Sequence, residues 1–314
     1  MKTSVIIATY NGSKFIEEQF DSILAQSVQL DEVVITDDGS KDNTREVVQR
    51  YIDEHDLNKK WHLHVNEKNK GYARNFLDGA MLTTGDIVFF CDQDDIWISD
   101  RVKKMSEVME KNPKINLLCS NLEPFYYEED TRKWSEKDLK AMKTDGSLEI
   151  CDLTPEYFHL KRSGCTMCIR KTFLEEIMPY WTANWPHDDF VWKMAVISSS
   201  CAILHFVSMR RRMHSNNATV IRVRTRDWRI KQLHEYQMQY TELKKYAQKY
   251  NVPDTYSKII DKNIKSIKQR ISLVEHHNLF AWPILAINFK DCYPRKKGLY
   301  LDGYLSIMKE YKGI

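Results

Sequence analysis

The sequence predicts an α/β fold in which a mostly parallel central sheet is flanked by helices and followed by a helical C-terminal region. Short runs rich in Val, Ile and Phe alternate with longer amphipathic stretches in the first part of the chain. From Trp228 onward Gly and Pro are scarce up to Pro253, and apolar residues recur near helical spacing. With 314 residues and 42% hydrophobic content, the chain can bury a sizeable core.

Strands and helices are expected to alternate along the N-terminal part. The expected strands lie, in order, at Thr3–Ala8, Glu32–Thr36, Trp61–Val65 and Asp86–Cys91. The expected helices lie at about Ser13–Gln26, Asn43–Glu54 and Tyr72–Leu82. The second helix opens on Asn43-Thr44-Arg45-Glu46, which has the form of a capping box because a glutamate follows the N-cap side chain by three residues.

The later part of the chain first turns polar and then helical. The stretch from Glu123 to Asp152 is charged, which is typical of an exposed excursion between core elements. The helical composition that follows favours a domain boundary near residue 225. We therefore expect an α/β domain over residues 1–224 and a helical region over residues 225–314.

Composition excludes several classes of protein. A net charge of +3 and a pI near 8.3 are too small an overall positive charge to indicate nucleic-acid binding, so we expect no nucleic-acid partner. The seven cysteines are odd in number and stand mostly in apolar runs, which favours buried thiols over disulfides. No Gly-x-Gly-x-x-Gly follows the first strand and no P-loop motif occurs, which argues against dinucleotide enzymes and P-loop NTPases.

The chain is expected to be cytoplasmic. The apolar stretch after Met1 is too short for a signal peptide, and the run Leu279–Phe289 is too short and interrupted for a membrane span. Aromatic residues near Arg295-Lys296-Lys297 would suit peripheral association with the inner face of the cell membrane, and ordinary helix packing explains them equally well.

Two acidic clusters follow predicted strands. Asp37-Asp38 ends the second strand and Asp92-Gln93-Asp94-Asp95 ends the fourth, where open α/β sheets bind ligands. Crowded carboxylates repel unless a cation holds them, and hard oxygen ligands suit Mg²⁺ or Mn²⁺. The alternative is an acidic turn before a helix with an N-cap at Ser99.

Four ordered segments resemble the family 2 glycosyltransferases, which have the GT-A fold. They are Val5-Ile6-Ile7-Ala8-Thr9-Tyr10-Asn11-Gly12, Val34-Ile35-Thr36-Asp37-Asp38-Gly39-Ser40, Gly71-Tyr72-Ala73-Arg74-Asn75 and Asp92-Gln93-Asp94-Asp95. The resemblance covers roughly the first 220 residues and is closest to rhamnosyltransferase-like members. Four motifs in order are far more specific than any one of them.

The resemblance implies roles for individual positions in binding a nucleotide diphosphate sugar. Ala8 and Tyr10 would line the nucleobase pocket, and Asp38 would read the pyrimidine edge. The remaining implied positions are Arg74 on the donor side, Asp94 near the ribose and donor sugar and at the metal, Asp95 as the direct metal ligand, and Asp92 completing the Asp-x-Asp form. For Arg74 the alternative is an ion pair on a helix surface.

A catalytic base is expected after the donor motifs, because an inverting transfer needs a carboxylate opposite the leaving diphosphate. Trp185-Pro186-His187-Asp188-Asp189-Phe190 resembles the family's Glu-Asp motif in its His-Asp form. This points to Asp188 as the base and leaves Asp189 as the second candidate. An acidic pair opening a helix is compatible with either role.

Two further features draw attention. Arg210 to Asn217 resembles the family's Arg-x-His-x-x-Asn stretch, in which His214 would approach the metal or the diphosphate, and the run from Ser208 to Gln232 holds eight Lys or Arg against one acid. A solvated basic face is the alternative. The pair Cys165 and Cys168 lacks the partners of a tetrahedral zinc site, so we expect both to be structural.

Together these features predict an inverting, metal-dependent, non-processive glycosyltransferase. The donor would be dTDP-rhamnose or a UDP-hexose, and the acceptor a saccharide or lipid-linked saccharide of a bacterial surface polysaccharide. A rival hypothesis is a catalytically silent nucleotide-sugar-binding or scaffold subunit. A nucleotidyltransferase is disfavoured because Thr9-Tyr10-Asn11-Gly12-Ser13 lacks a Gly-rich loop bearing Lys or Arg.

Overall fold

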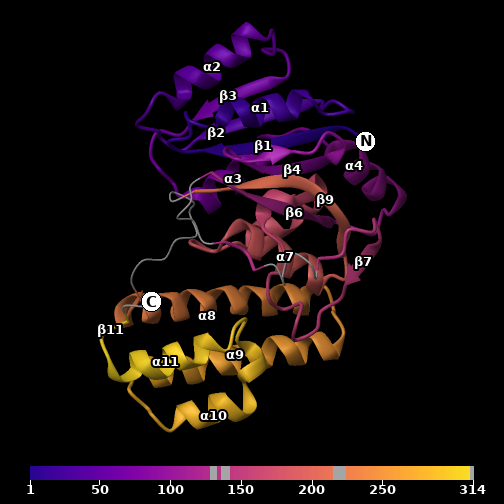
Figure 1. The fold of residues 1–314 in the computed structure, drawn as a ribbon. Coiled ribbons are helices and arrows are strands. Elements are labelled where there is room, and N and C mark those ends of the chain that lie inside the picture. Colours follow the sequence, from indigo (N-terminus) through magenta and orange to yellow (C-terminus); the bar gives the residue numbers. More distant parts are fainter. Residues whose placement is uncertain (128–132, 136–141, 215–223, 312–314) are drawn as a thin grey trace.

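The computed structural model describes residues 1–127, 133–135, 142–214 and 224–311. Figure 1 shows a central sheet with helices on its faces and a layer of long helices, α8 to α11, beyond one side of it. Helix α7 (His187–Ile197) lies between the sheet and α8 (Arg226–Lys249), and packs against both. The fold therefore has an α/β part and a helical part, as the sequence predicts.

Within the described residues the main sheet has nine strands, with the order β3-β2-β1-β4-β8-β6-β9-β5 and β7 paired to β9. Its strands are β1 (Thr3–Thr9), β2 (Glu32–Asp37), β3 (Trp61–Val65), β4 (Ile87–Asp92), β5 (Ile96–Trp97), β6 (Leu117–Tyr126), β7 (Leu148–Cys151), β8 (Met167–Arg170) and β9 (Cys201–Met213). The first four strands in this order are parallel. Strand β8 then runs antiparallel to both β4 and β6, a reversal that the strand pattern alone did not reveal.

The remaining helices of the described residues surround this sheet and form the C-terminal layer. They are α1 (Ile16–Leu24), α2 (Thr44–Glu54), α3 (Tyr72–Leu82), α4 (Arg101–Lys111), α6 (Lys171–Ile177), α9 (Asp254–Val274), α10 (Ala281–Asn288) and α11 (Lys297–Ile307), with short 3-10 turns at Gly164–Thr166, Met178–Tyr180 and Lys290–Cys292. A two-stranded sheet joins β10 (Arg224–Thr225) to β11 (Glu310–Tyr311).

The central strands are buried on both faces, which explains their nearly continuous apolar sequences. Alternate residues point to opposite sides, so Ile6 and Phe90 join one hydrophobic cluster while Val5 and Phe89 join the other. The first cluster continues through α7 into the C-terminal helices and includes Leu233. Residue 225, the predicted boundary, lies in β10, and this core is continuous across it, so the division into two domains stays a prediction.

The local predictions hold for most elements, with one correction. The strand at Trp61–Val65 and the helix at Tyr72–Leu82 have their expected bounds. The capping box at Asn43 is wrong, because the Asn43 side chain makes no capping hydrogen bond. Instead the Asp42 carboxylate accepts a hydrogen bond from the Thr44 amide at 3.1 Å, which places the cap one residue earlier.

Other bounds differ by a few residues. Helix α1 begins at Ile16 rather than Ser13, because Ser13 donates from its amide and its hydroxyl to Asp42. The excursion predicted between Glu123 and Asp152 is strand at both ends, in β6 and β7, and part of it lies outside the described residues.

A buried ionic cluster ties the C-terminal helices together. Asp302 of α11 is fully buried and accepts hydrogen bonds from Arg229 of α8 at 2.6 Å and from Arg270 of α9 at 2.7 Å. The Tyr293 hydroxyl donates to the same carboxylate at 2.9 Å. Although burial alone would raise it, the two arginines lower the pKa of Asp302. Among the described residues, no helix is long and apolar enough to cross a membrane.

Candidate functional site

The parallel order β2-β1-β4 brings the two acidic clusters to one edge of the sheet. In the register, Thr9 at the end of β1 is opposite Asp37 of β2, and Ala8 is opposite Asp92 of β4. Carboxyl ends of neighbouring parallel strands meet at the same edge, so the predicted ligand-binding edge contains both clusters.

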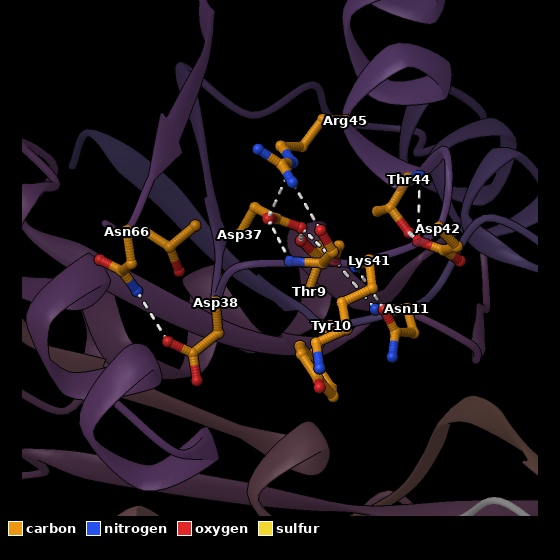
Figure 2. A network of polar contacts seen from close by, with 12 residues as sticks. Thr9, Tyr10, Asn11, Asp37, Asp38, Lys41, Asp42, Thr44, Arg45 and Asn66 are labelled. Carbon is orange, nitrogen blue, oxygen red and sulfur yellow. Dashed lines mark hydrogen bonds and ion pairs between the residues drawn. The ribbon is translucent and has the colours of Figure 1, made fainter. Parts of the chain in front are cut away.

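Asp37 holds the first two strand ends together. It is fully buried, accepts a hydrogen bond from the Thr9 hydroxyl at 3.0 Å and from the Ser40 amide at 2.9 Å, and lies 3.6 Å from the Arg45 guanidinium. Figure 2 shows this network, in which Asn11 also accepts a hydrogen bond from the Lys41 amide at 2.8 Å. All of the Asp37 contacts are internal, so we assign it to scaffolding.

Asp38 points away from this network, toward Asn66 (Figure 2). Its carboxylate accepts hydrogen bonds from the amides of Lys70 and Gly71, at 2.8 and 2.9 Å, and from the Asn66 side chain at 3.0 Å. A carboxylate has about four acceptor positions. Three donors therefore leave one position on Asp38 for a ligand, and its assignment to the pyrimidine edge stays a prediction.

Gln93 fixes the acidic loop to the end of β1. Its side-chain oxygen accepts a hydrogen bond from the Tyr10 amide at 2.9 Å, and its side-chain nitrogen donates to the Tyr10 carbonyl at 3.1 Å. Gly12 makes room for it, because a Cβ there would lie 2.1 Å from the Gln93 oxygen. The Tyr10 ring is 42% exposed and thus accessible to a planar ligand.

Asp92, Asp95 and Cys165 form the densest ligand cluster at this edge. One ligand atom from each lies within 4.8 Å of the others, and Asp95 Oδ2 is buried with no hydrogen-bond partner. Burial and the charge of Asp94 raise the pKa of Asp92 to about 6, and burial with Asp94 and Asp92 raises that of Asp95 well above its usual value. Crowded carboxylates with an unsatisfied oxygen fit a divalent cation.

The end of strand β9 and the residue after it, His214, supply the groups that face these acids. The Arg212 amide donates to Asp95 Oδ1 at 3.0 Å, and His214 Nε2 lies 2.8 Å from Asp94 Oδ2. Burial lowers the pKa of Arg211, but Cys165 and the three carboxylates outweigh it, so that pKa is raised overall. His214 thus joins the acidic cluster through Asp94, while the Ser215-Asn216-Asn217 part of the predicted motif lies outside the described residues.

The first turn of α7 carries the candidate base. The Asp188 carboxylate accepts one hydrogen bond within the described residues, from the adjacent Asp189 amide at 2.8 Å. Asp188 begins close to the acidic cluster, because a Cβ at Gly164, the residue before Cys165, would lie 3.2 Å from Asp188 Cβ. Asp189 is instead occupied, because it accepts a hydrogen bond from the Trp185 indole at 2.8 Å and pairs with Lys193. The geometry therefore favours Asp188 over Asp189 as a base.

The position of α7 depends on a glycine. The His187 ring stacks on Phe76 with ring centres 4.2 Å apart, and burial lowers its pKa. A Cβ at Gly164 would lie 2.4 Å from His187 Nε2 and 3.2 Å from Asp188 Cβ. Any larger residue at position 164 would push the start of α7 away from the acids, so Gly164 sets the approach of Asp188.

Arg74 takes the surface position that was the alternative prediction. Its guanidinium lies 2.7 Å from the Asp78 carboxylate one turn along α3 and 5.3 Å from the centre of the Trp181 ring. The side chain is half exposed and remains within reach of solvent, so a role toward the donor stays a prediction.

Sequence reasoning missed two members of the cluster. Cys165 was expected to be structural, and all seven cysteines are indeed free and buried, but its sulfur lies beside Asp92 and Asp95. Arg211 was seen only as part of a basic run. Neither had a local signal, because the turn at Gly164–Thr166 and strand β9 reach the cluster through tertiary packing.

Comparison with known sequences gives consistent matches. Residues 4–177, more than half of the chain, match the profile of Glycosyl transferase family 2. An uncharacterised glycosyltransferase of Nostoc sp. is 26% identical over 190 residues, which cover 59% of this chain and 56% of that protein. The dTDP-rhamnosyl transferase RfbG of Shigella flexneri is 29% identical over 222 residues, covering 67% of this chain and 72% of RfbG. The chain spans 56% to 65% of the length of three curated uncharacterised relatives.

Solved structures share the fold at low identity. Residues 1–349 of S. aureus TarS in complex with UDP-GlcNAc superpose with a TM-score of 0.64 and 17% identity, covering 98% of this chain and 88% of that one. The mannosyltransferase PcManGT from Pyrobaculum calidifontis, in complex with GDP-Man and Mn²⁺, gives a TM-score of 0.56 and 17% identity, covering 98% and 84%. The GT-A α/β fold predicted from the sequence is thereby confirmed.

Proposed function

The chain belongs to Glycosyl transferase family 2, and from this premise we propose that it transfers a sugar from a nucleotide diphosphate donor to an acceptor hydroxyl with inversion at the anomeric carbon. The observation that carries the proposal is the proximity of Asp188 to the acidic cluster: a Cβ at Gly164, which adjoins Cys165 of the cluster, would lie 3.2 Å from Asp188 Cβ, and the Asp188 carboxylate has no side-chain partner among the described residues. One carboxylate group binds the donor side, and the other faces it from α7.

The residues at the sheet edge fit a divalent cation, Mn²⁺ or Mg²⁺. Asp95 would hold it through the unpartnered Oδ2, with Asp92 or Asp94 beside it and His214 orienting Asp94. When bound, the cation would offset the charge that develops on the departing diphosphate. Mn²⁺ is present in the PcManGT complex, which supports this choice for a protein of the same fold.

The chain's own groups divide the remaining work. Ala8, Tyr10 and Asp38 hold the nucleoside at the ends of β1 and β2, and the Arg211 guanidinium adds positive charge near the phosphates. Asp188 accepts the proton of the acceptor hydroxyl while the new bond from that oxygen to the anomeric carbon forms. The bond between that carbon and the diphosphate oxygen breaks on the opposite side of the sugar, which inverts the configuration.

The relatives indicate which donors to test first. RfbG of Shigella flexneri is described as a dTDP-rhamnosyl transferase and TarS was crystallised with UDP-GlcNAc, so dTDP-rhamnose and UDP-hexoses are the first donors to test. We further propose one sugar per encounter, with an acceptor saccharide, free or lipid-linked, in bacterial surface polysaccharide synthesis.

A donor screen tests the proposal. Thermal unfolding is measured with dTDP-, UDP- and GDP-sugars, each with and without MnCl₂. A donor at about 100 times its dissociation constant should add ~2.7 kcal/mol of stability. For the donor that stabilises the protein, NMR of the product of slow hydrolysis or transfer should show the inverted anomer.

The outcomes separate the hypotheses. Failure of every donor to stabilise the protein contradicts the assignment. Stabilisation without any hydrolysis or transfer indicates a silent nucleotide-sugar-binding subunit, and a retained anomeric configuration contradicts the role of Asp188. The Asp95→Ala variant should lose the additional effect of MnCl₂ while keeping its fold, which circular dichroism checks.

A further inference from the structure

The exposed apolar side chains of the molecule are concentrated at one end. Of the 22 large hydrophobic side chains that are exposed among the described residues, ten lie between residues 279 and 311. That span is 33 of 314 residues, so the density there is several times the average. The most exposed are Phe280 at 83%, Ile287 at 73%, and Tyr300 and Ile307 at 67% each. Contiguous exposed apolar surface of this kind marks an interaction site.

These residues form stripes on two helices. On α10 and its N-cap, Phe280, Ile284 and Ile287 recur at helical spacing and are exposed, while Ala281 and Leu285 are buried. Helix α11 repeats the pattern, with the exposed residues Tyr300, Tyr304 and Ile307 and the buried residues Leu301 and Leu305. Each helix therefore has two apolar faces, of which only one is used by the fold.

The two helices meet directly. A Cβ at Gly303 of α11 would lie 2.6 Å from Trp282 Nε1 of α10, so the indole packs on the glycine and links the two stripes. Both helices pack on α9; α11 also packs on α8, and α10 lies on the side of α9 away from the sheet (Figure 1). We call the exposed residues of these helices, Phe280, Trp282, Ile284, Ile287, Tyr300, Tyr304 and Ile307, the apolar end face.

The flanks of the apolar end face are positively charged. Exposed cations follow α10, open α11 and follow it, and within the described residues none is in an ion pair: Lys290, Arg295, Lys296, Lys297 and Lys309. Of the nearby acids, Asp291 pairs with Lys262, Asp302 is buried between two arginines, and Glu310 is exposed beside Lys309, so five cations outnumber one exposed acid. The face thus combines apolar area with uncompensated positive charge.

We propose that the apolar end face binds the surface of an anionic lipid membrane. Aromatic and branched apolar side chains would enter the boundary between headgroups and acyl chains, and the flanking cations would contact anionic headgroups. A second copy of this chain fits less well, because a two-fold interface through this face would bring like charges together. The inference concerns α10 and α11 and does not depend on which donor or acceptor the sheet edge binds.

Vesicle binding tests the proposal. Sedimentation of the full chain is measured with phosphatidylcholine vesicles and with vesicles that contain phosphatidylglycerol. We expect binding to the anionic vesicles only, and weaker binding in 0.5 M NaCl because salt screens surface charge. Changing Arg295→Gln, Lys296→Gln and Lys297→Gln together should reduce the partition coefficient on the order of a hundredfold.

Matched variants assign the binding to this face. The triple change Ile284→Ser, Ile287→Ser and Ile307→Ser should reduce binding at least tenfold. The control Val65→Ser, Ile150→Ser and Met238→Ser removes apolar side chains that are 47%, 53% and 51% exposed elsewhere, and should leave binding unchanged. Charge is controlled by Lys59→Gln, Lys60→Gln and Lys103→Gln, which lie outside α10 and α11.

Several results would overturn the proposal. Equal binding to neutral and anionic vesicles, or equal losses in the test and control variants, would show that the apolar end face is not the membrane contact. Sedimentation velocity without vesicles tests the alternative, that the apolar end face binds a second copy of this chain. A dimer that the isoleucine variant dissociates, together with no vesicle binding by the unaltered chain, would identify the face as a contact between copies.

Discussion

Asp188 and Asp189 are neighbours in sequence, but their environments differ. Asp188→Asn should therefore reduce activity and leave stability nearly unchanged, whereas Asp189→Asn should mainly reduce stability. Asp188 accepts only a local backbone hydrogen bond within the described residues. Asp189 pairs with Lys193, which is 5% exposed, and accepts a hydrogen bond from the Trp185 indole. Asparagine keeps the size of either side chain, removes its charge and basicity, and replaces one acceptor oxygen by an NH₂ donor.

The expected magnitudes follow from these environments. Loss of a general base reduces the rate by about 10²- to 10⁴-fold, or roughly 3 to 5 kcal/mol in the barrier, so Asp188→Asn should lower kcat by that factor with little effect on stability. Removing one partner of a buried ion pair costs about 3 to 5 kcal/mol. Asp189 is 19% exposed, so we expect the lower end of that range for Asp189→Asn. At roughly 2 °C per kcal/mol for a chain of this size, Tm should fall by about 6 °C.

Two measurements on each variant complete the test. Initial rates are compared at saturating donor, and Tm is measured by thermal unfolding in the same buffer. Donor affinity, from calorimetry, should remain within about threefold in Asp188→Asn, which shows that the donor site is intact. If Asp189→Asn instead loses activity at an unchanged Tm while Asp188→Asn stays active, the assignment of the base is wrong.

Three further predictions concern the acids, the buried cluster and the thiol. The raised pKa of Asp92, about 6 against a usual 3.8, means that the folded protein binds this proton more tightly than the unfolded chain. The metal-free protein should therefore gain stability as the pH falls from 7 through 6 toward 4, as measured by urea unfolding with EDTA. Asp92→Asn should reduce that gain, and an unchanged pH dependence in this variant would contradict the raised pKa. Asp302→Asn leaves two buried arginines uncompensated and should destabilise the protein by about 3 to 5 kcal/mol. Asp291→Asn, at a partly exposed pair, should cost less than about 1 kcal/mol. Equal shifts in Tm would refute the role of the buried cluster. Cys165→Ser removes the one soft ligand atom of the candidate metal site, so inhibition by Cd²⁺ in a Mn²⁺-supported assay should weaken severalfold; unchanged inhibition would place the thiol outside that site.

The first half of the fold could be predicted because its signals are local. Strands β1, β2 and β4 each contain an uninterrupted apolar run, and the strand at Trp61–Val65 and the helix at about Tyr72–Leu82 have their expected bounds. The second half was harder, because β8 has four residues and β5 only two. Such strands are defined by their neighbours in the sheet rather than by their own sequences.

The same contrast applies to the site. Asp92, Asp94 and Asp95 are contiguous in a motif, so the sequence alone located them. Cys165 reaches them from a distant turn, and only the fold reveals that proximity. The cap of α2 was misplaced because Asp42, Asn43 and Thr44 are all suitable capping residues, and tertiary contacts to Ser13 decided among them.

The contact between Gln93 and Tyr10 has a mechanical consequence. The Gln93 carboxamide makes the two hydrogen bonds that a further backbone pair of the sheet would make. The acidic loop is therefore bound to the end of β1 beyond the last backbone pair of β1 and β4. A shift of the acidic loop relative to β1 would break both hydrogen bonds at once. The part of this edge expected to bind the nucleoside and the part expected to bind the cation must therefore move together. The end of β9 moves with these two parts as well, because the Arg212 amide donates to Asp95 and His214 is paired with Asp94, so any closure around a substrate would have to come from α7.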